Sequence, residues 1–171
     1  WQTDVTGKDE NDWESALLKL IYFPKEGKLK KSDKPYRLAV GLDWAVDLGD
    51  QEKGIGSGSD TVGPFFGAAI AAKPGLMFIP LIQHFVEYSG LDVNLTAARL
   101  IALQTLSSAK WLKMDLKVPY DWEKESWPAD VEFQLGKSFR KTVGAYVDAQ
   151  AGIGSDRPYD WALGIGVRFN Y

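Results

Sequence analysis

The last segment of the chain alternates strictly between bulky apolar residues and small or polar ones, and this limits the fold more than any other feature. From position 159, every second residue is apolar or aromatic: Tyr159, Trp161, Leu163, Ile165, Val167, Phe169 and Tyr171. The residues between them are Asp160, Ala162, Gly164, Gly166, Arg168 and Asn170. A period of two places these sets on opposite faces of a β-strand. Aromatic residues at both ends of the apolar face are typical of a strand that crosses lipid between two aromatic girdles.

Most of the chain can be divided into further strands of this kind. Segments 38–48, 112–122, 129–136 and 143–153 alternate in the same way. Segments 14–23, 61–72 and 76–88 are predicted strands that are mixed or apolar on both faces. Segment 93–106 is also a predicted strand, and Arg99 is expected on its apolar face unless a bulge shifts the register.

Two folds fit this alternation, a membrane-spanning barrel and a soluble lipocalin-like or sandwich fold. Several of the strands run to roughly 11–13 residues, against roughly 5–6 in globular proteins. Their polar face is rich in Gly and Ala, which suits a crowded lumen better than a solvated surface. The predicted fold class is therefore all-β, an antiparallel up-and-down transmembrane β-barrel of the outer-membrane type.

Composition excludes several other classes. The longest apolar stretch, 62–80, is interrupted by glycines, prolines and a lysine, so it does not predict a transmembrane helix. The absence of cysteine excludes a disulfide framework and the usual zinc sites. A net charge of −3 without a basic stripe argues against nucleic-acid binding, while the 7 tryptophans suit a membrane interface. No cofactor and no metal are expected.

The connections between the predicted strands suggest a direction. Segments 72–75, 107–108 and 140–142 look like tight turns, whereas 49–60, 89–92, 121–126 and 155–158 are mostly longer and more acidic. Short periplasmic turns and longer external loops would place the acidic segments outside, with the Lys-rich connection 25–35 as a long exception. The count is about nine strands, whereas single-chain bacterial barrels have even numbers. The odd count suggests missing N-terminal strands, a miscounted strand or an N-terminal segment with another role. We expect residues 1–171 to be one barrel domain that lacks N-terminal strands.

The polar face supplies the candidate functional residues. The predicted lumen-lining residues are Asp43, Asp47, Lys113, Asp115, Lys117, Asp130, Glu132, Gln134, Asp148, Gln150 and Arg168. They would act either as a mutually paired network that fills the interior or as a lining that selects solutes by charge. The predicted membrane-interface aromatics are Trp44, Tyr120, Trp122, Trp161, Phe169 and Tyr171.

No arrangement of residues predicts an enzyme. His84 is the only histidine, and a catalytic histidine needs a nucleophile and an orienting partner. Ser89 is the one candidate nucleophile near it, which leaves an outer-membrane hydrolase as a minor alternative. The glycine-rich string 54–60 lacks the Lys-Ser/Thr ending and the helix of a phosphate-binding loop, so it is predicted to be a flexible loop.

Several short motifs resemble one family over roughly residues 36–171. They are Gly56-Ser57-Gly58 with Gly63-Pro64, Gln83-His84, Ser89-Gly90, Val93-Asn94, Trp111, Asp121-Trp122-Glu123, Trp127, Gly136-Lys137 and Asp160-Trp161. In order and spacing these resemble bacterial outer-membrane proteins of the transporter or neuromedin-U type, in the group named for the phenol-degradation meta pathway. The family tends to have a Gln-Pro-Phe-like stretch where this chain has Arg99. The resemblance implies a barrel of about a dozen strands and carries over no catalytic residues.

The sequence therefore predicts one of two functions. The first is movement of small, aromatic or otherwise hydrophobic solutes across the bacterial outer membrane through a selective lumen. The second is a structural or interaction role for a barrel whose lumen is filled. Expected partners are outer-membrane lipid, a small-molecule solute and the barrel-assembly machinery, which would bind the C-terminal strand. Homo-oligomerisation is left open.

Overall fold

Every regular element that the structure describes is a β-strand. The computed structural model describes residues 2–3, 9–10, 15–49, 57–106, 109–140, 142–157 and 159–169. In these ranges no helix is long and apolar enough to span a membrane. The strands are β1 Gln2–Thr3, β2 Asp9–Glu10, β3 Ser15–Lys28, β4 Pro35–Asp47, β5 Ser59–Lys73, β6 Leu76–Gly90, β7 Asn94–Thr105, β8 Lys110–Asp121, β9 Ala129–Ser138, β10 Val143–Ile153 and β11 Trp161–Phe169.

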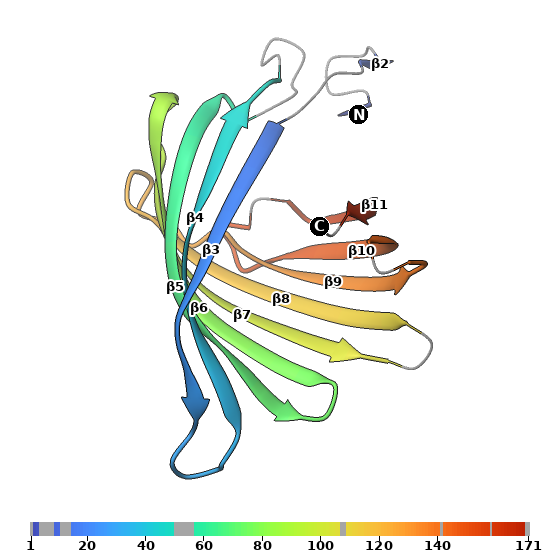
Figure 1. Ribbon diagram of the computed structural model, residues 1–171. Coiled ribbons are helices and arrows are strands. Elements are labelled where there is room, and N and C mark those ends of the chain that lie inside the picture. Colours follow the sequence, from blue (N-terminus) through green and yellow to red (C-terminus); the bar gives the residue numbers. More distant parts are fainter. Residues whose placement is uncertain are drawn as a thin grey trace.

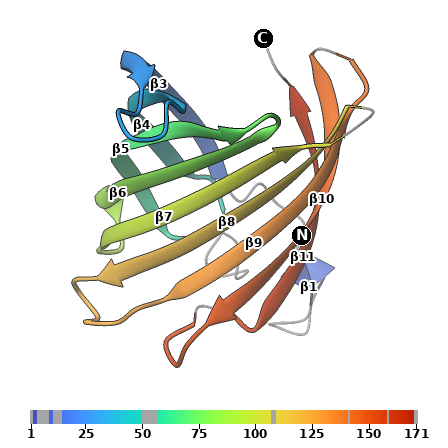
Figure 2. The same ribbon diagram turned by 90° about the horizontal axis from the view of Figure 1, so that it is seen from below.

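Nine of these strands form one sheet in which each strand pairs with its neighbours in sequence. The order runs from β3 to β11 without a crossover, and every pairing is antiparallel. The sheet is strongly curved, so that its strands form the wall of a trough (Figures 1 and 2). Strands β3 and β11 are the two edges, and no other described strand pairs with the free side of either. The predicted all-β, up-and-down architecture of about nine strands is confirmed. The figure of about twelve for a full-length protein stays a prediction.

Burial in this sheet is the reverse of that in a soluble domain. Among the described residues the buried apolar side chains are only Ala39, Ala97 and Ala129, whereas eight polar or charged residues are buried. The large apolar side chains are exposed instead, and Ile165 is 87% exposed. Because side chains alternate between faces, most of the exposed apolar side chains lie on the convex face and the buried charged side chains lie on the concave one. A soluble sandwich would bury the apolar set.

Several predicted strand boundaries are wrong. Strand β3 does not end near Phe23 but continues to Lys28, with a register shift between Tyr22 and Lys25. The lysine-rich connection is therefore shortened to the turn 29–34, in which Asp33 has a φ of 52°. At the other end β11 begins at Trp161, since the pairing of β10 with β11 stops there. Tyr159 consequently lies in the connection before the strand.

The expected register problem at Arg99 is absent. The pairing of β7 is continuous with both neighbours, and Arg99 lies opposite Leu81 and Lys117 without a bulge. It shares a face with Ile101, as predicted, but that face is the concave one. The prediction of an outward apolar face was wrong here because apolar side chains also point inward from β6 and β7.

Of the described connections, the tight β5–β6 turn agrees with the prediction. Pro74–Gly75 forms the tight β5–β6 turn, and the φ of 77° at Gly75 suits glycine. The β6–β7 connection is shorter than predicted because β6 continues to Gly90. The predicted turn at 107–108, Lys141 in the turn 140–142, most of the loop 49–60 with the string 54–56, and Tyr171 lie outside the described residues.

Candidate functional site on the concave face

All the predicted lumen-lining residues lie on the concave side of the sheet. Strands β4, β8, β9, β10 and β11 carry them, and cross-strand pairing brings Asp115 opposite Glu132 and Lys117 opposite Asp130. Whether they line an open lumen stays a prediction. Eleven positions were predicted and occupy this face: Asp43, Asp47, Lys113, Asp115, Lys117, Asp130, Glu132, Gln134, Asp148, Gln150 and Arg168.

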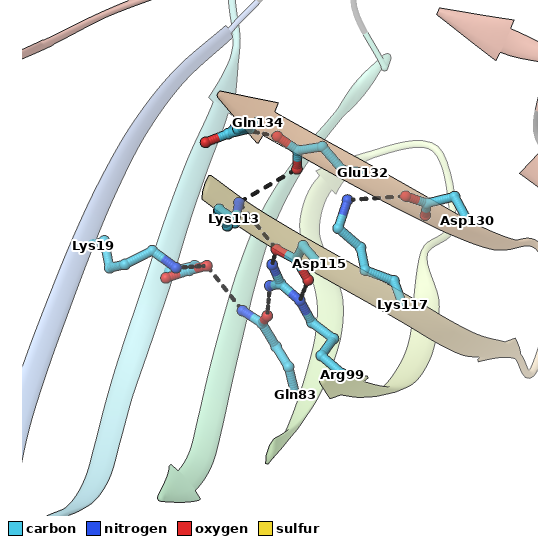
Figure 3. Close-up of polar contacts among 10 residues, drawn as sticks. Lys19, Gln83, Arg99, Lys113, Asp115, Lys117, Asp130, Glu132 and Gln134 are labelled. Carbon is cyan, nitrogen blue, oxygen red and sulfur yellow. Dashed lines mark hydrogen bonds and ion pairs between the residues drawn. The ribbon is translucent and has the colours of Figure 1, made fainter. Parts of the chain in front are cut away.

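A row of charged and amide side chains crosses this face from β3 to β9 (Figure 3). We call this row the ion belt. It consists of Lys19, Asp43, Gln83, Arg99, Lys113, Asp115, Glu132 and Gln134.

The first half of the ion belt joins four strands through Asp43 and Gln83. Asp43 Oδ2 accepts hydrogen bonds from Lys19 Nζ at 2.7 Å and from Gln83 Nε2 at 2.9 Å. The side-chain oxygen of Gln83, Oε1, accepts a hydrogen bond from Arg99 Nη1 at 2.8 Å. Gln83 therefore links a carboxylate on β4 to a guanidinium on β7, and its amide is used at both ends.

The second half is an alternation of charges on β7, β8 and β9. Arg99 Nη2 lies 2.7 Å from Asp115 Oδ2, and Lys113 Nζ lies 3.2 Å from the same oxygen. Lys113 also lies 3.4 Å from Glu132 Oε2, and the Gln134 amide donates to Glu132. Each cation here bridges groups on two strands, so the belt ties the strands together at mid-length.

Burial makes this arrangement energetically sensitive. Asp115 is 0% exposed and Gln83 is 1% exposed. A buried charge is tolerated only when it is paired and hydrogen-bonded, and removing one partner leaves the other uncompensated. Among the described residues, Asp43 Oδ1 and Gln134 Oε1 are buried without a hydrogen-bond partner. These two oxygens are the sites at which the belt could accept a further donor.

Glycine at position 63 makes room for the belt on β5. A Cβ atom there would lie 2.8 Å from the Phe85 ring and 3.0 Å from Gln83 Nε2. Gln83 can therefore reach over β5 to Asp43, and its Nε2 also donates to the Gly63 carbonyl at 3.3 Å.

Three members of the ion belt were missed by the sequence analysis: Lys19, Gln83 and Arg99. They lie on β3, β6 and β7. Strands β3 and β6 are mixed or apolar on both faces and give no contrast from which to assign the inward side, whereas the apolar face of β7 was assigned to the outside. The position of Arg99 could have identified the inward face of β7, because a charged residue within a long predicted barrel strand is expected to face the interior.

The remaining predicted lining residues have diverse partners. Lys117 Nζ lies 3.4 Å from Asp130 Oδ2, and the Arg168 guanidinium stacks 4.6 Å from the centre of the Trp111 ring. Gln150 Nε2 donates to Asp148 at 3.2 Å. Asp47 instead accepts the backbone N–H groups of residues 49 and 58, at 3.1 and 2.6 Å. Asp47 thus holds the end of a loop, a structural role.

An apolar hollow of about 350 Å³ adjoins the ion belt on the concave face. Ile21, Phe65 and Leu81 line it, and the small residue Ala39 leaves space at its floor. Lys19, a member of the belt, contributes to its wall. The concave face therefore combines an ordered polar row with an adjacent apolar surface.

Five of the six predicted interface aromatics lie toward the strand ends on the convex face, and the sixth, Tyr171, lies outside the described residues. Trp44 Nε1 donates to Tyr88 Oη at 2.6 Å, and Trp122 Nε1 donates to Thr96 Oγ1 at 2.9 Å. Tyr120 packs edge-on against Trp122, with ring centres 4.9 Å apart. Trp161 and Phe169 are exposed at opposite ends of β11. Rings with a polar atom satisfied and an apolar body exposed are typical of a membrane interface.

His84 faces outward and takes no part in the ion belt. Its Nδ1 is 2.9 Å from Thr96 Oγ1, which makes the threonine its partner in place of Ser89. In the described part of the chain, no cluster of three or more His, Cys, Asp or Glu side chains could hold a metal ion.

Tyr159, in the β10–β11 connection, leads to a prediction about pH. Burial, together with the negative charges of Asp130 and Glu132, raises its pKa from 10.0 to about 12. Its hydroxyl donates to Gln150 Oε1 at 2.9 Å. The folded state holds the Tyr159 hydroxyl proton more tightly than the unfolded state does. The stability of the folded protein should therefore fall as pH rises from about 10 to 12. The ultraviolet difference between wild type and Tyr159→Phe should titrate near pH 12; a midpoint near 10 would contradict this.

Comparison with known proteins shows a distant structural similarity to one solved outer-membrane protein. No protein-family model matches the sequence, and no curated protein matches it. Among solved structures, an anion-selective porin from Comamonas acidovorans is similar, with a TM-score of 0.47 and 13% sequence identity. The alignment covers 94% of this chain and 57% of that porin, so the chain spans little more than half its length.

Proposed function

We propose that this chain forms part of the wall of an outer-membrane β-barrel channel. One observation carries the proposal: large apolar side chains are exposed on the convex face, while charged and amide side chains are buried on the concave face. Exposure of this apolar face to water would be unfavourable, whereas an apolar outer surface is expected for a barrel in contact with lipid. The aromatic residues at the strand ends support the same placement. Insertion through the barrel-assembly machinery and homo-oligomerisation remain part of the proposal.

The proposed solutes are small, aromatic or otherwise hydrophobic molecules. The apolar hollow beside the ion belt supports this class, because it offers apolar contact on an otherwise polar face. The resemblance to the transporter or neuromedin-U-type family points to the same class. The ion belt would then select by charge and size as the solute passes.

The test is single-channel conductance of the protein in a planar bilayer, comparing wild type with Asp130→Asn/Glu132→Gln. These carboxylates are inward-facing and paired with Lys117 and Lys113. Neutralising both leaves the lysines in excess, so the expected result is stepwise conductance whose cation preference falls in the variant. A double variant of exposed turn lysines, Lys30→Gln/Lys31→Gln, should leave the preference almost unchanged.

The second candidate is a barrel with a filled lumen that anchors loops or a partner. The mutual pairing within the ion belt favours it, since paired charges can fill and rigidify an interior. Protein that is inserted but electrically silent would support this candidate and contradict the channel.

A further inference from the structure

A further hollow lies on the convex face, near the start of β8 and the end of β9. It has a volume of about 660 Å³, and Leu135, Val147 and Ile165 form its apolar wall. These three residues are neighbours across strands β9, β10 and β11. Ala145 lies two residues from Val147 on the same face, nearer the strand end, where its small side chain leaves the groove open.

Two lysines stand at the mouth of this groove. Lys110 and Lys137 are directly opposite each other on β8 and β9, and both are exposed. Within the described residues neither forms a salt bridge with a carboxylate. Like charges directly opposite each other across two strands are destabilising. An anion bound between the two ammonium groups would relieve this repulsion.

We propose that this groove binds an anionic phospholipid, with its phosphate between Lys110 and Lys137 and one acyl chain along the apolar wall. This inference rests on the proposed placement of the convex face in lipid. The strand ends would then lie at headgroup level and the groove would extend toward the bilayer centre. Basic residues beside spanning segments attract anionic headgroups, and the apolar wall fits a hydrocarbon chain. Both requirements of an anionic lipid are thus met at one place.

The experiment is native mass spectrometry of the folded protein in detergent with equal amounts of phosphatidylglycerol and phosphatidylcholine. Wild type should retain phosphatidylglycerol in preference. Lys110→Gln/Lys137→Gln should weaken this retention roughly tenfold or more, at about 1 kcal/mol per basic residue. Lys30→Gln/Lys31→Gln, which removes the same charge from the β3–β4 turn, should not weaken it.

A further variant separates the groove from the charge. Ala145→Leu should reduce retention of both lipids while leaving the lysines in place, with the β-sheet circular dichroism signal confirming the fold. Equal retention of both lipids by wild type, or an equal loss in the turn variant, would overturn the proposal. Conductance is measured independently, so a silent protein that retains phosphatidylglycerol would contradict the channel and still support this site.

Discussion

Replacing Arg99 by methionine is expected to lower the free energy of unfolding by roughly 3–5 kcal/mol. Arg99 is the partner of Asp115, which is 0% exposed, and it also donates to Gln83. Its removal leaves the Asp115 carboxylate with Lys113 alone and leaves the Gln83 carbonyl without its donor. The measurement is denaturant unfolding in lipid vesicles, followed by tryptophan fluorescence.

A matched control is Arg37→Met on β4. The Arg37 side chain is 55% exposed, and its partner Glu26 lies 3.3 Å away on the exposed edge strand. An exposed pair of this kind contributes about 1 kcal/mol or less, so a small loss is expected. Arg99→Met/Asp115→Leu should recover part of the loss, because both buried charges are then gone. Equal losses in the two single variants would show that the ion belt does not stabilise the sheet.

Replacing Ile82 by arginine is expected to destabilise the protein by roughly 2–4 kcal/mol in lipid vesicles. Ile82 lies near the middle of β6 on the convex face and is 61% exposed. If that face meets lipid, a guanidinium there must leave water at the centre of the bilayer. If the face met water, a substitution at so exposed a site would change stability by only about 0.5 kcal/mol.

The comparison variant is Phe78→Arg, on the same face of the same strand but nearer its end. Because the cost of a charge falls toward the interface, a smaller loss is expected than at Ile82. The readout is again denaturant unfolding in vesicles. Near-zero changes at both positions would contradict the placement in a membrane, whatever the conductance of the protein.

The sequence by itself determined the strands and the division of residues between two faces in the strands that alternate. Alternation is a local property of the extended chain, since neighbouring side chains point to opposite sides whatever the strand pairs with. This is why the inward set on β8 to β11, including Asp115, Glu132 and Arg168, could be named without coordinates. Strands β3 and β6 could not be oriented because they are mixed or apolar on both faces, and β7 was oriented wrongly because its more apolar face points inward.

Only the tertiary structure decided which inward residues meet. Asp43 and Gln83 are 40 positions apart in sequence and come together because the stagger between β4, β5 and β6 places them at the same height. On β7 and β8 the contact is diagonal, since Arg99 pairs with Asp115 although its direct cross-strand neighbour is Lys117. Such pairings depend on register and curvature accumulated over several strands. Alternation within a single strand carries no information about either quantity.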